Sequence, residues 1–317
     1  MPRSPSTVEP QAPAAKMHAD ELDIDEELVA ALVAEQFPQW ARLPVLRVLS
    51  SGTDNAMFRL GDELVVRLPR IPSAARQVSK EQRWLPHLAP SLPLEIPAPV
   101  GLGQTSDAFP LPWSVYRWIE GSDAAAAPPT DLTETAQRLG EFVHALERVP
   151  SAGGPASFRG GPLSSRDVST RVEIDDLGGA GKIDGDRARW YWDSVLALPR
   201  WNGEPVWLHS DLLPGNLVTV DGVVTAVIDF GGCGTGDPAC DLMAAWTVLD
   251  EASRPTFRAA AGVDDDTWAR GRGWAFCFGV GAWHYYEVTN TALAGVGRRT
   301  ALAILDKVGR WHGAPSA

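Results

Sequence analysis

Apolar side chains recur at helical spacing over residues 21–37, ELDIDEELVAALVAEQF, directly after a group of acidic residues. Acidic residues before such a pattern favour a helix start. The pattern then changes to strand-like runs over residues 44–50, 55–61 and 63–69. Since LGDE separates the second run from the third, we expect a helix followed by three strands.

A second helix is predicted over residues 73–89, SAARQVSKEQRWLPHLA, with Ser73 as its N-cap. Two further strand-like runs follow at 98–103 and 113–121. These elements predict a small β-rich lobe over residues 21–121.

Beyond this lobe the pattern becomes mainly helical. The segment GSDAAAAPPTD at 121–131 is rich in Ala and Pro and is typical of a linker. Helical patterns follow over 132–149, about 166–178 and about 184–198, and from about 238 onward. We therefore expect a larger, mostly helical lobe over residues 122–317.

Composition narrows the classes of protein. The 317 residues are 44% hydrophobic, and the net charge of −12 argues against a nucleic-acid binder. Three cysteines without a CxxC pair argue against a disulfide framework. No apolar run approaches the roughly 18 residues of a membrane span. Residues 1–20 are predicted to be a disordered tail, and we expect a cytoplasmic protein without membrane, nucleic-acid or obligatory protein partners.

The acidic excess is concentrated in the helical part. Residues 122–317 carry 25 acidic and 17 basic side chains, whereas residues 28–121 carry eight and nine. An acidic lobe attracts a cationic small molecule, but it also simply keeps a protein soluble. Both interpretations stay open.

Chemistry-bearing residues gather in one stretch, VWLHSDLLPGNLVTVDGVVTAVIDFGGCGTGDPACDLMAAW. Asp211 and Asn216 are separated by four residues, so one loop can present a base and a second oxygen ligand. Asp229 follows the strand-like VVTAVI and precedes Phe230 and Gly231. Mg²⁺ prefers such hard oxygen ligands, and phosphoryl transfer needs a carboxylate and a bound metal. The stretch predicts Mg²⁺-dependent phosphoryl transfer.

The segments HSDLLPGN and VIDFGGCGTGDPACDL resemble the aminoglycoside phosphotransferase family, a small-molecule branch of the protein-kinase-like fold. The resemblance covers about residues 40–312. It implies an α+β, bilobal fold, with a small antiparallel sheet and one main helix in the first lobe. By this resemblance Asp211 is the catalytic base and Asn216 and Asp229 are the Mg²⁺ ligands.

The same resemblance assigns supporting roles. His209 and Asp237 are implied to support the catalytic loop, and Asp241 to cap or anchor the helix after it. Ser210 stands where the family usually has Gly. If the backbone there needs a positive φ, serine carries a conformational cost.

The first lobe contains an implied nucleotide site. The segment LSSGTDNAMFRL resembles the nucleotide-covering loop of the family, and the residues of this loop implied to bind nucleotide are Ser51, Gly52, Thr53 and Asn55. Small and polar residues let backbone N–H groups approach phosphate.

Other first-lobe residues complete the implied nucleotide site. Arg67 stands where a kinase has its strand lysine, as in the macrolide-kinase-like branch, with Glu81 as its partner. Trp118 and Ile119 belong to the implied hinge at the nucleobase. Neither Ala-Pro-Glu after DFGG nor His-Arg-Asp is present, which argues against a protein kinase.

The acceptor site has only weak signals. Trp283, Tyr286 and Glu287 lie near one face of a predicted helix, where they either pack in the core or line an acceptor site. The acidic clusters at 173–176 and 264–266 are either solvated helix starts or the border of a cationic substrate.

These observations predict a phosphotransferase that moves the γ-phosphate of ATP or GTP, with Mg²⁺, to a hydroxyl of a small molecule. An antibiotic acceptor, either an aminoglycoside or a macrolide, would make it a resistance enzyme. The alternatives are a metabolic kinase for a sugar or amino alcohol and a nucleotide-binding pseudoenzyme or scaffold.

Overall fold

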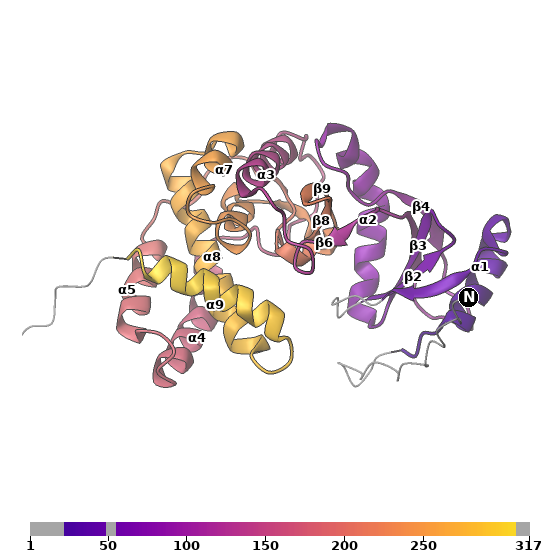
Figure 1. The fold of residues 1–317 in the computed structure, drawn as a ribbon, viewed down its shortest axis with the longest axis horizontal. Coiled ribbons are helices and arrows are strands. Elements are labelled where there is room, and N and C mark those ends of the chain that lie inside the picture. The colour runs from indigo at the N-terminus through magenta and orange to yellow at the C-terminus, as the bar shows by residue number, and fades with distance from the viewer. Residues whose placement is uncertain (1–21, 49–54, 309–317) are drawn as a thin grey trace, which may run out of the picture. The chain divides into compact units, whose positions relative to one another are not determined.

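The computed structural model describes residues 22–48 and 55–308. The chain forms two compact units (Figure 1). The first contains Met1–Val78 and Gly101–Tyr116, and the second contains Ser79–Val100 and Arg117–Ala317. This division assigns residues 79–100 to the second unit, and the functional roles of the predicted lobes stay predictions.

The first unit is built on a sheet with the strand order β1-β2-β3-β5-β4. The strands are β1 (Val45–Val48), β2 (Asn55–Leu60), β3 (Leu64–Pro69), β4 (Pro99–Gly103) and β5 (Trp113–Arg117). Strand β2 pairs antiparallel with β1 and with β3. Its side chains alternate between half-buried and buried, which is the period-2 pattern of a strand with one core face.

Helix α1 (Glu26–Gln36) packs on the apolar core of the first unit. Asp25 caps its start by accepting a hydrogen bond from the Leu28 backbone N–H at 2.8 Å. The buried face of α1 joins a cluster with side chains of the sheet: Val29, Leu32, Val33, Phe58, Leu60, Val66, Leu68, Trp113 and Val115. Burial of this apolar surface is the main favourable contribution to the unit's stability.

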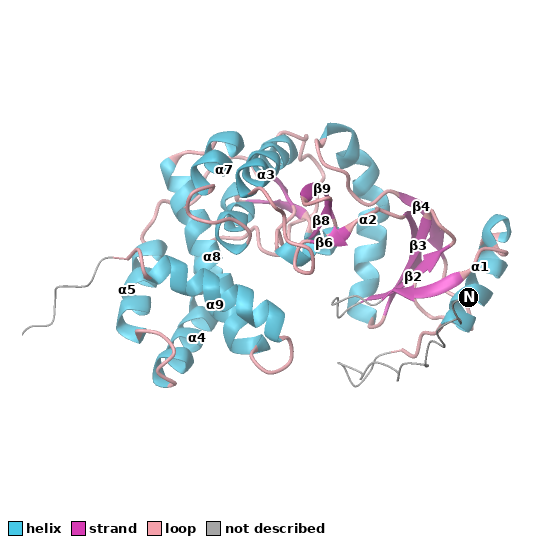
Figure 2. Ribbon diagram, in the orientation of Figure 1, coloured by secondary structure: helices cyan, strands magenta, loops and turns pink. Residues whose placement is uncertain are grey.

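Helices make up most of the second unit (Figure 2). They are α3 (Leu132–Glu147), α4 (Asp167–Gly179), α5 (Gly185–Leu196), α6 (Ala244–Thr247), α7 (Arg254–Ala261), α8 (Asp265–Tyr286) and α9 (Thr291–Leu305). Helix α2 (Ala75–Leu88) begins in the first unit and continues in the second. Helix α8 packs against α9, α4 and the 3₁₀ helix η7 (Pro238–Met243), which makes it the central helix of the unit.

Two small sheets of the second unit hold the loops that carry the predicted chemistry. One has the order β6-β8-β9, with β6 (Ser122–Asp123), β8 (Leu217–Val220) and β9 (Val223–Val227). The other pairs β10 (Gly234–Gly236) antiparallel with β7 (Val206–Leu208).

The sequence predicted the fold class correctly, as an α+β protein with a small sheet followed by a mostly helical part. Several boundaries differ. The first helix begins at Glu26 rather than near 21. Ser73 lies inside the 3₁₀ helix η2 (Pro72–Ala74) rather than at an N-cap. Within the described residues, none of the helices combines the length and apolar surface that crossing a bilayer requires.

Candidate active site

The β8–β9 hairpin brings Asn216 close to the segment that carries Asp229. Its two-residue turn, Asp221 and Gly222, has φ values of 50° and 79°, as a type I′ turn requires. Asn216 precedes β8, and Ile228 follows β9. The Ile228 N–H donates to the Asn216 carbonyl at 2.9 Å. Asp229 is the next residue, so the hairpin places the two predicted metal ligands at the same end.

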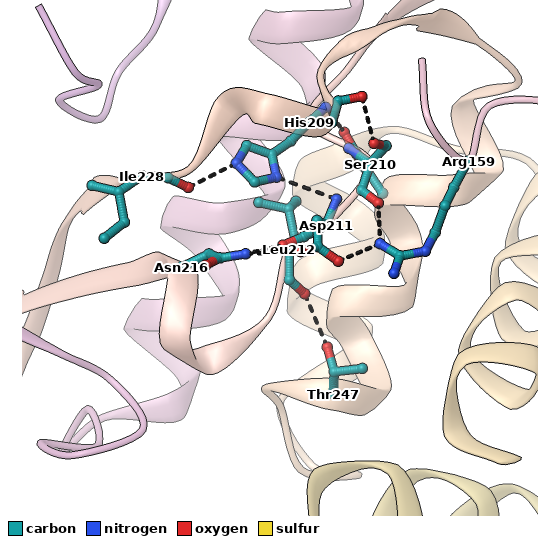
Figure 3. A network of polar contacts seen from close by, with 10 residues as sticks. Arg159, His209, Ser210, Asp211, Leu212, Asn216, Ile228 and Thr247 are labelled. Carbon is teal, nitrogen blue, oxygen red and sulfur yellow. Dashed lines mark hydrogen bonds and ion pairs between the residues drawn. The ribbon is translucent and has the colours of Figure 1, made fainter. Parts of the chain in front are cut away.

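Asn216 is also tied directly to Asp211. Its Nδ2 donates to the Asp211 carbonyl oxygen at 2.8 Å and to Asp211 Oδ2 at 3.1 Å (Figure 3). Because the amide nitrogen faces Asp211, the amide oxygen remains the acceptor end of the side chain.

Buried His209 connects the two halves of the site. Its Nδ1 accepts from the Asp211 N–H at 3.3 Å, and its Nε2 lies 2.9 Å from the Ile228 carbonyl oxygen (Figure 3). Since Nδ1 accepts, the ring proton is on Nε2 and donates to Ile228. The ring packs edge-on against Phe230, with centroids 4.6 Å apart. His209 thereby fixes Asp211 relative to the strand end that precedes Asp229.

Buried Asp241 holds the loop that carries Asp211 by the loop's backbone. Its carboxylate accepts from the N–H groups of His209, at 2.7 Å, and Ser210, at 2.6 Å. Burial raises the pKa of Asp241, while His209 and the two backbone donors act in the opposite direction. The carboxylate thus contacts the loop before the hairpin. The role of Asp241 at the following helix stays a prediction.

Ser210 has φ of +66°, the left-handed region that favours glycine. Its Oγ donates to the Gly232 carbonyl at 2.8 Å. The positive φ considered for this position is therefore present, and local hydrogen bonds hold the serine in it.

Asp237 contacts a different element. It forms a buried, two-pronged ion pair with Arg270 of α8, at 3.0 Å from Nε and 3.2 Å from Nη2. It also accepts from the Ala239 N–H at 3.0 Å at the start of η7. Asp237 thus joins η7 to α8, next to the segment that contains Asp241.

Arg159 forms an ion pair with Asp211, a contact that the sequence did not reveal. Its Nη1 donates to Asp211 Oδ1, and to the Ser210 carbonyl at 2.9 Å (Figure 3). Figure 3 shows Arg159 and Asn216 on opposite sides of Asp211. Burial alone would lower the pKa of Arg159, but the Asp211 carboxylate outweighs it and the pKa is raised.

The segment that carries Arg159 docks by its backbone onto β10 and its neighbours. The Phe158 N–H donates to the Gly232 carbonyl at 2.9 Å, and the Asp237 N–H donates to the Gly160 carbonyl at 3.0 Å. A Cβ on Gly236 would lie 2.4 Å from the Gly160 oxygen, so only glycine fits there.

Lys80 of α2 was also missed. Its Nζ donates to the Gly231 carbonyl and, at 2.9 Å, to the Cys233 carbonyl. These carbonyls belong to the loop after Asp229, so Lys80 stabilises the conformation of that loop. Asp229 itself has φ of 63°.

The predicted nucleotide residues are only partly described. Ser51, Gly52 and Thr53 lie outside the described residues. Arg67 of β3 interacts with Asn55 of β2: with the Asn55 amide oxygen turned toward the guanidinium, this oxygen accepts from Nη2 at 2.9 Å and from Nε at 3.2 Å.

The remaining first-lobe predictions lie in the second unit. Glu81 is buried in α2, with 2% of its surface exposed. Its pairing with Arg67 stays a prediction. Trp118 and Ile119 follow β5 and are half-buried, and their contact with a nucleobase also stays a prediction.

The three residues predicted for the acceptor site lie at the C-terminal end of α8. Trp283 is buried, with the Arg298 guanidinium 5.8 Å from its ring centroid. The Glu287 carboxylate forms an ion pair with Lys182, with both oxygens within 2.6 Å of Nζ. Tyr286 packs edge-on against Tyr285. Their role in binding an acceptor stays a prediction.

The oxygen atoms at the hairpin fit Mg²⁺. Asn216 and Asp229 supply an amide oxygen and a carboxylate, which are hard ligands. Within residues 22–48 and 55–308, no three His, Cys, Asp or Glu side chains form a metal-binding group. A site with few protein ligands is typical of Mg²⁺ that is also held by phosphates and water.

An aspartate next to this oxygen pair, on a small-sheet and helical architecture, fits a phosphotransferase of the kinase-like class. The sequence model of the Phosphotransferase enzyme family matches residues 45–274, and the chain belongs to this family. An aminoglycoside 3′-phosphotransferase of Escherichia coli is 26% identical over 258 residues, which cover 73% of this chain and 88% of that protein.

Solved structures share the fold. Aminoglycoside 2′-phosphotransferase-IIIa in its GDP complex aligns with a TM-score of 0.69 at 21% identity, covering 89% of this chain and 99% of that chain. The apoenzyme of macrolide 2′-phosphotransferase MphH from Brachybacterium faecium aligns with a TM-score of 0.59 at 23% identity, covering 89% and 98%.

Proposed function

We propose that the chain transfers the γ-phosphate of ATP or GTP to a hydroxyl group of a small-molecule acceptor. The hydrogen-bonded unit of Asp211, Asn216 and His209 carries this proposal. Asp211 accepts the proton of the attacking hydroxyl and orients it, which is the usual task of a kinase catalytic aspartate. Arg159 and Asn216 fix the direction of its carboxylate.

Asn216 and Asp229 are proposed to hold Mg²⁺. The bound ion would supply positive charge that neutralises the transferring phosphate oxygens. Lys80 and His209 keep the two ligand-bearing segments in place by the hydrogen bonds described above. Arg67 and Asn55 are proposed to bind nucleotide phosphates, as the family resemblance implies.

The named relatives make aminoglycoside and macrolide antibiotics the first acceptors to assay. A metabolic alcohol is the alternative acceptor. We also propose a cytoplasmic location, where ATP and GTP are available.

The test is Mg²⁺-dependent phosphate transfer by wild type and by Asp211→Asn, read by mass spectrometry of the acceptor. Loss of a positioned general base lowers turnover by about 10²–10⁴-fold, so we expect Asp211→Asn to be folded and nearly inactive. Asp221→Asn, at the hairpin turn, is the matched control and should keep full activity. Full activity of Asp211→Asn would exclude the proposed role.

A further inference from the structure

A pocket of about 370 Å³ lies beside the catalytic loop, within the second unit. The segment at 156–161 forms one wall, and Arg166 and Trp274 form others. Arg159 connects the pocket to Asp211, because the residue lines the pocket and its guanidinium binds the Asp211 carboxylate. A molecule with a hydroxyl at Asp211 can therefore extend into this pocket.

The lining carries positive charge and no carboxylate. The charge of Arg159 is matched by Asp211. The Arg166 guanidinium lies 5.6 Å from the ring centroid of Phe158, and within the described part of the chain it forms no ion pair. Arg166 is thus a half-buried cation without a carboxylate partner among the described residues, on the wall of a pocket.

Two hydrogen-bond donors of the pocket also have no partner among the described residues. They are the Ser157 hydroxyl and the Trp274 indole N–H, and both atoms are buried in the pocket wall, out of reach of a molecule in the pocket. Trp274 is 1% exposed. The cation of the lining that a bound oxyanion can pair with is therefore Arg166.

Four carboxylates of the two acidic clusters, in contrast, have partners inside the protein. Asp175 pairs with Arg189 at 2.7 Å and Asp176 with His284 at 2.9 Å. Asp264 caps α8 through the Thr267 N–H at 2.7 Å, and Asp265 pairs with Arg258. These contacts favour a structural role for these four carboxylates.

Glu173 is the carboxylate whose charge acts on Arg166. It does not line the pocket, and burial raises its pKa to about 7, with His284 and Arg166 opposing the rise. Its negative charge is therefore only partial near neutral pH, and it compensates Arg166 incompletely.

We propose that this pocket binds an oxyanion group of the acceptor, so that the acceptor is a hydroxyl compound bearing a carboxylate or a phosphate. The inference rests on the proposed function and narrows its substrate class. The acceptor hydroxyl lies at Asp211, while its anionic group lies at Arg166.

The test is isothermal titration calorimetry of the full-length protein with matched probes: gluconate against gluconamide, and glucose 6-phosphate against glucose. We expect each anionic probe to bind at least tenfold more tightly than its neutral match. Arg166→Met should abolish this preference, and Arg166→Lys should keep part of it because the charge remains. Arg189→Met, which removes an exposed cation of α5, should leave the preference unchanged.

Equal affinity for the anionic and neutral members would overturn the proposal, as would a preference that survives Arg166→Met. Inorganic phosphate is the competing source of the same chemistry. If inorganic phosphate binds more tightly than both gluconate and glucose 6-phosphate, the pocket binds the free ion and its assignment to an acceptor is overturned.

A parallel transfer assay separates this inference from the proposed function. If the protein phosphorylates kanamycin or another non-anionic acceptor, and Arg166→Met does not change the KM for that acceptor, the inference is wrong and the proposed function stands. An Arg166-dependent preference without transfer to any acceptor would support the pocket and count against the function.

Discussion

Ser210 shows how one residue of the catalytic loop is held in a conformation that its type disfavours. The left-handed region costs a non-glycine residue about 1–2 kcal/mol. The Ser210 N–H donates to buried Asp241 and its hydroxyl donates to Gly232. The first bond connects the segment of Ser210 to η7, and the second connects it to the loop after Asp229.

Replacement of Ser210 should reverse the usual order of alanine and glycine. Both variants lose the bond to Gly232, but only Ser210→Gly relieves the strain at φ of +66°. After the entropy cost of glycine in the unfolded chain, we expect Ser210→Gly to be about 0.5–1 kcal/mol more stable than Ser210→Ala. Urea denaturation of both variants measures the difference.

The same pair of substitutions at Ser169, an exposed residue of α4, is the control. There the alanine variant should be more stable by about 1 kcal/mol, because the backbone is helical. A less stable glycine variant at 210 would contradict the strain argument.

Site residues could be predicted where a local sequence motif marks them. Asp211, Asn216 and Asp229 stand in one short stretch with recognisable spacing, and the structure brings their segments together. Arg159 lies 52 residues from Asp211, and Lys80 lies 151 residues from Gly231. Neither has a local pattern that marks it, because only the tertiary fold creates the contact.

Among the elements, η7 and α8 are joined by a buried ion pair. Asp237 and Arg270 are each less than a tenth exposed, and Arg270 also donates to the Pro199 carbonyl at 3.2 Å. Removing one partner of such a pair leaves an uncompensated buried charge and costs about 3–5 kcal/mol.

Arg270→Met should therefore lower the free energy of unfolding by about 3–5 kcal/mol. The double variant Asp237→Asn/Arg270→Met should recover part of this loss, because the buried charge is gone and Asn still caps η7. Chemical denaturation gives both values. Arg258→Met breaks an exposed pair with Asp265 and should cost at most about 1 kcal/mol. A double variant as unstable as the sum of its singles would refute the coupling.

Element prediction succeeded where periodicity was long and regular. The amphipathic pattern over 132–149 corresponds to α3, Leu132–Glu147. The predicted strand at 113–121 was too long: β5 ends at Arg117, and Gly121 adopts φ of 130°, where a Cβ would lie 2.6 Å from the Thr219 carbonyl. The short β6 inside the predicted linker carries too few residues for a pattern.

For the whole molecule, Glu147 makes stability depend on pH. It lies at the end of α3, and its Oε1 is buried without a hydrogen-bond partner among the described residues. Burial, with smaller contributions from Asp241 and Asp237, raises the pKa of Glu147 from 4.5 to about 8. Below pH 4.5 the Glu147 carboxyl group is protonated in both the folded and the unfolded protein, so it does not lower the free energy of unfolding. As pH rises from 4.5 to about 8, the unfolded state releases its proton first and stability falls.

Glu147→Gln should remove this loss. We expect the variant to exceed wild type in unfolding free energy by about 2–4 kcal/mol at pH 8, and by much less at pH 5. Denaturation curves at both pH values test this. Glu141→Gln, on the exposed face of α3, should differ from wild type equally at both. A stability gain by Glu147→Gln that does not grow with pH would show that the carboxyl group ionises normally.

Backbone docking of the segment at 155–160 limits how the enzyme can be re-engineered. The same few residues line the pocket beside Asp211 and carry the guanidinium that pairs with its carboxylate. Gly236 admits no larger residue against Gly160, so a change that reshapes the pocket wall also displaces Arg159. Under the proposed function, substitutions in this segment should change acceptor range and turnover together, and a library that aims to vary acceptor range alone belongs on Arg166 and α8.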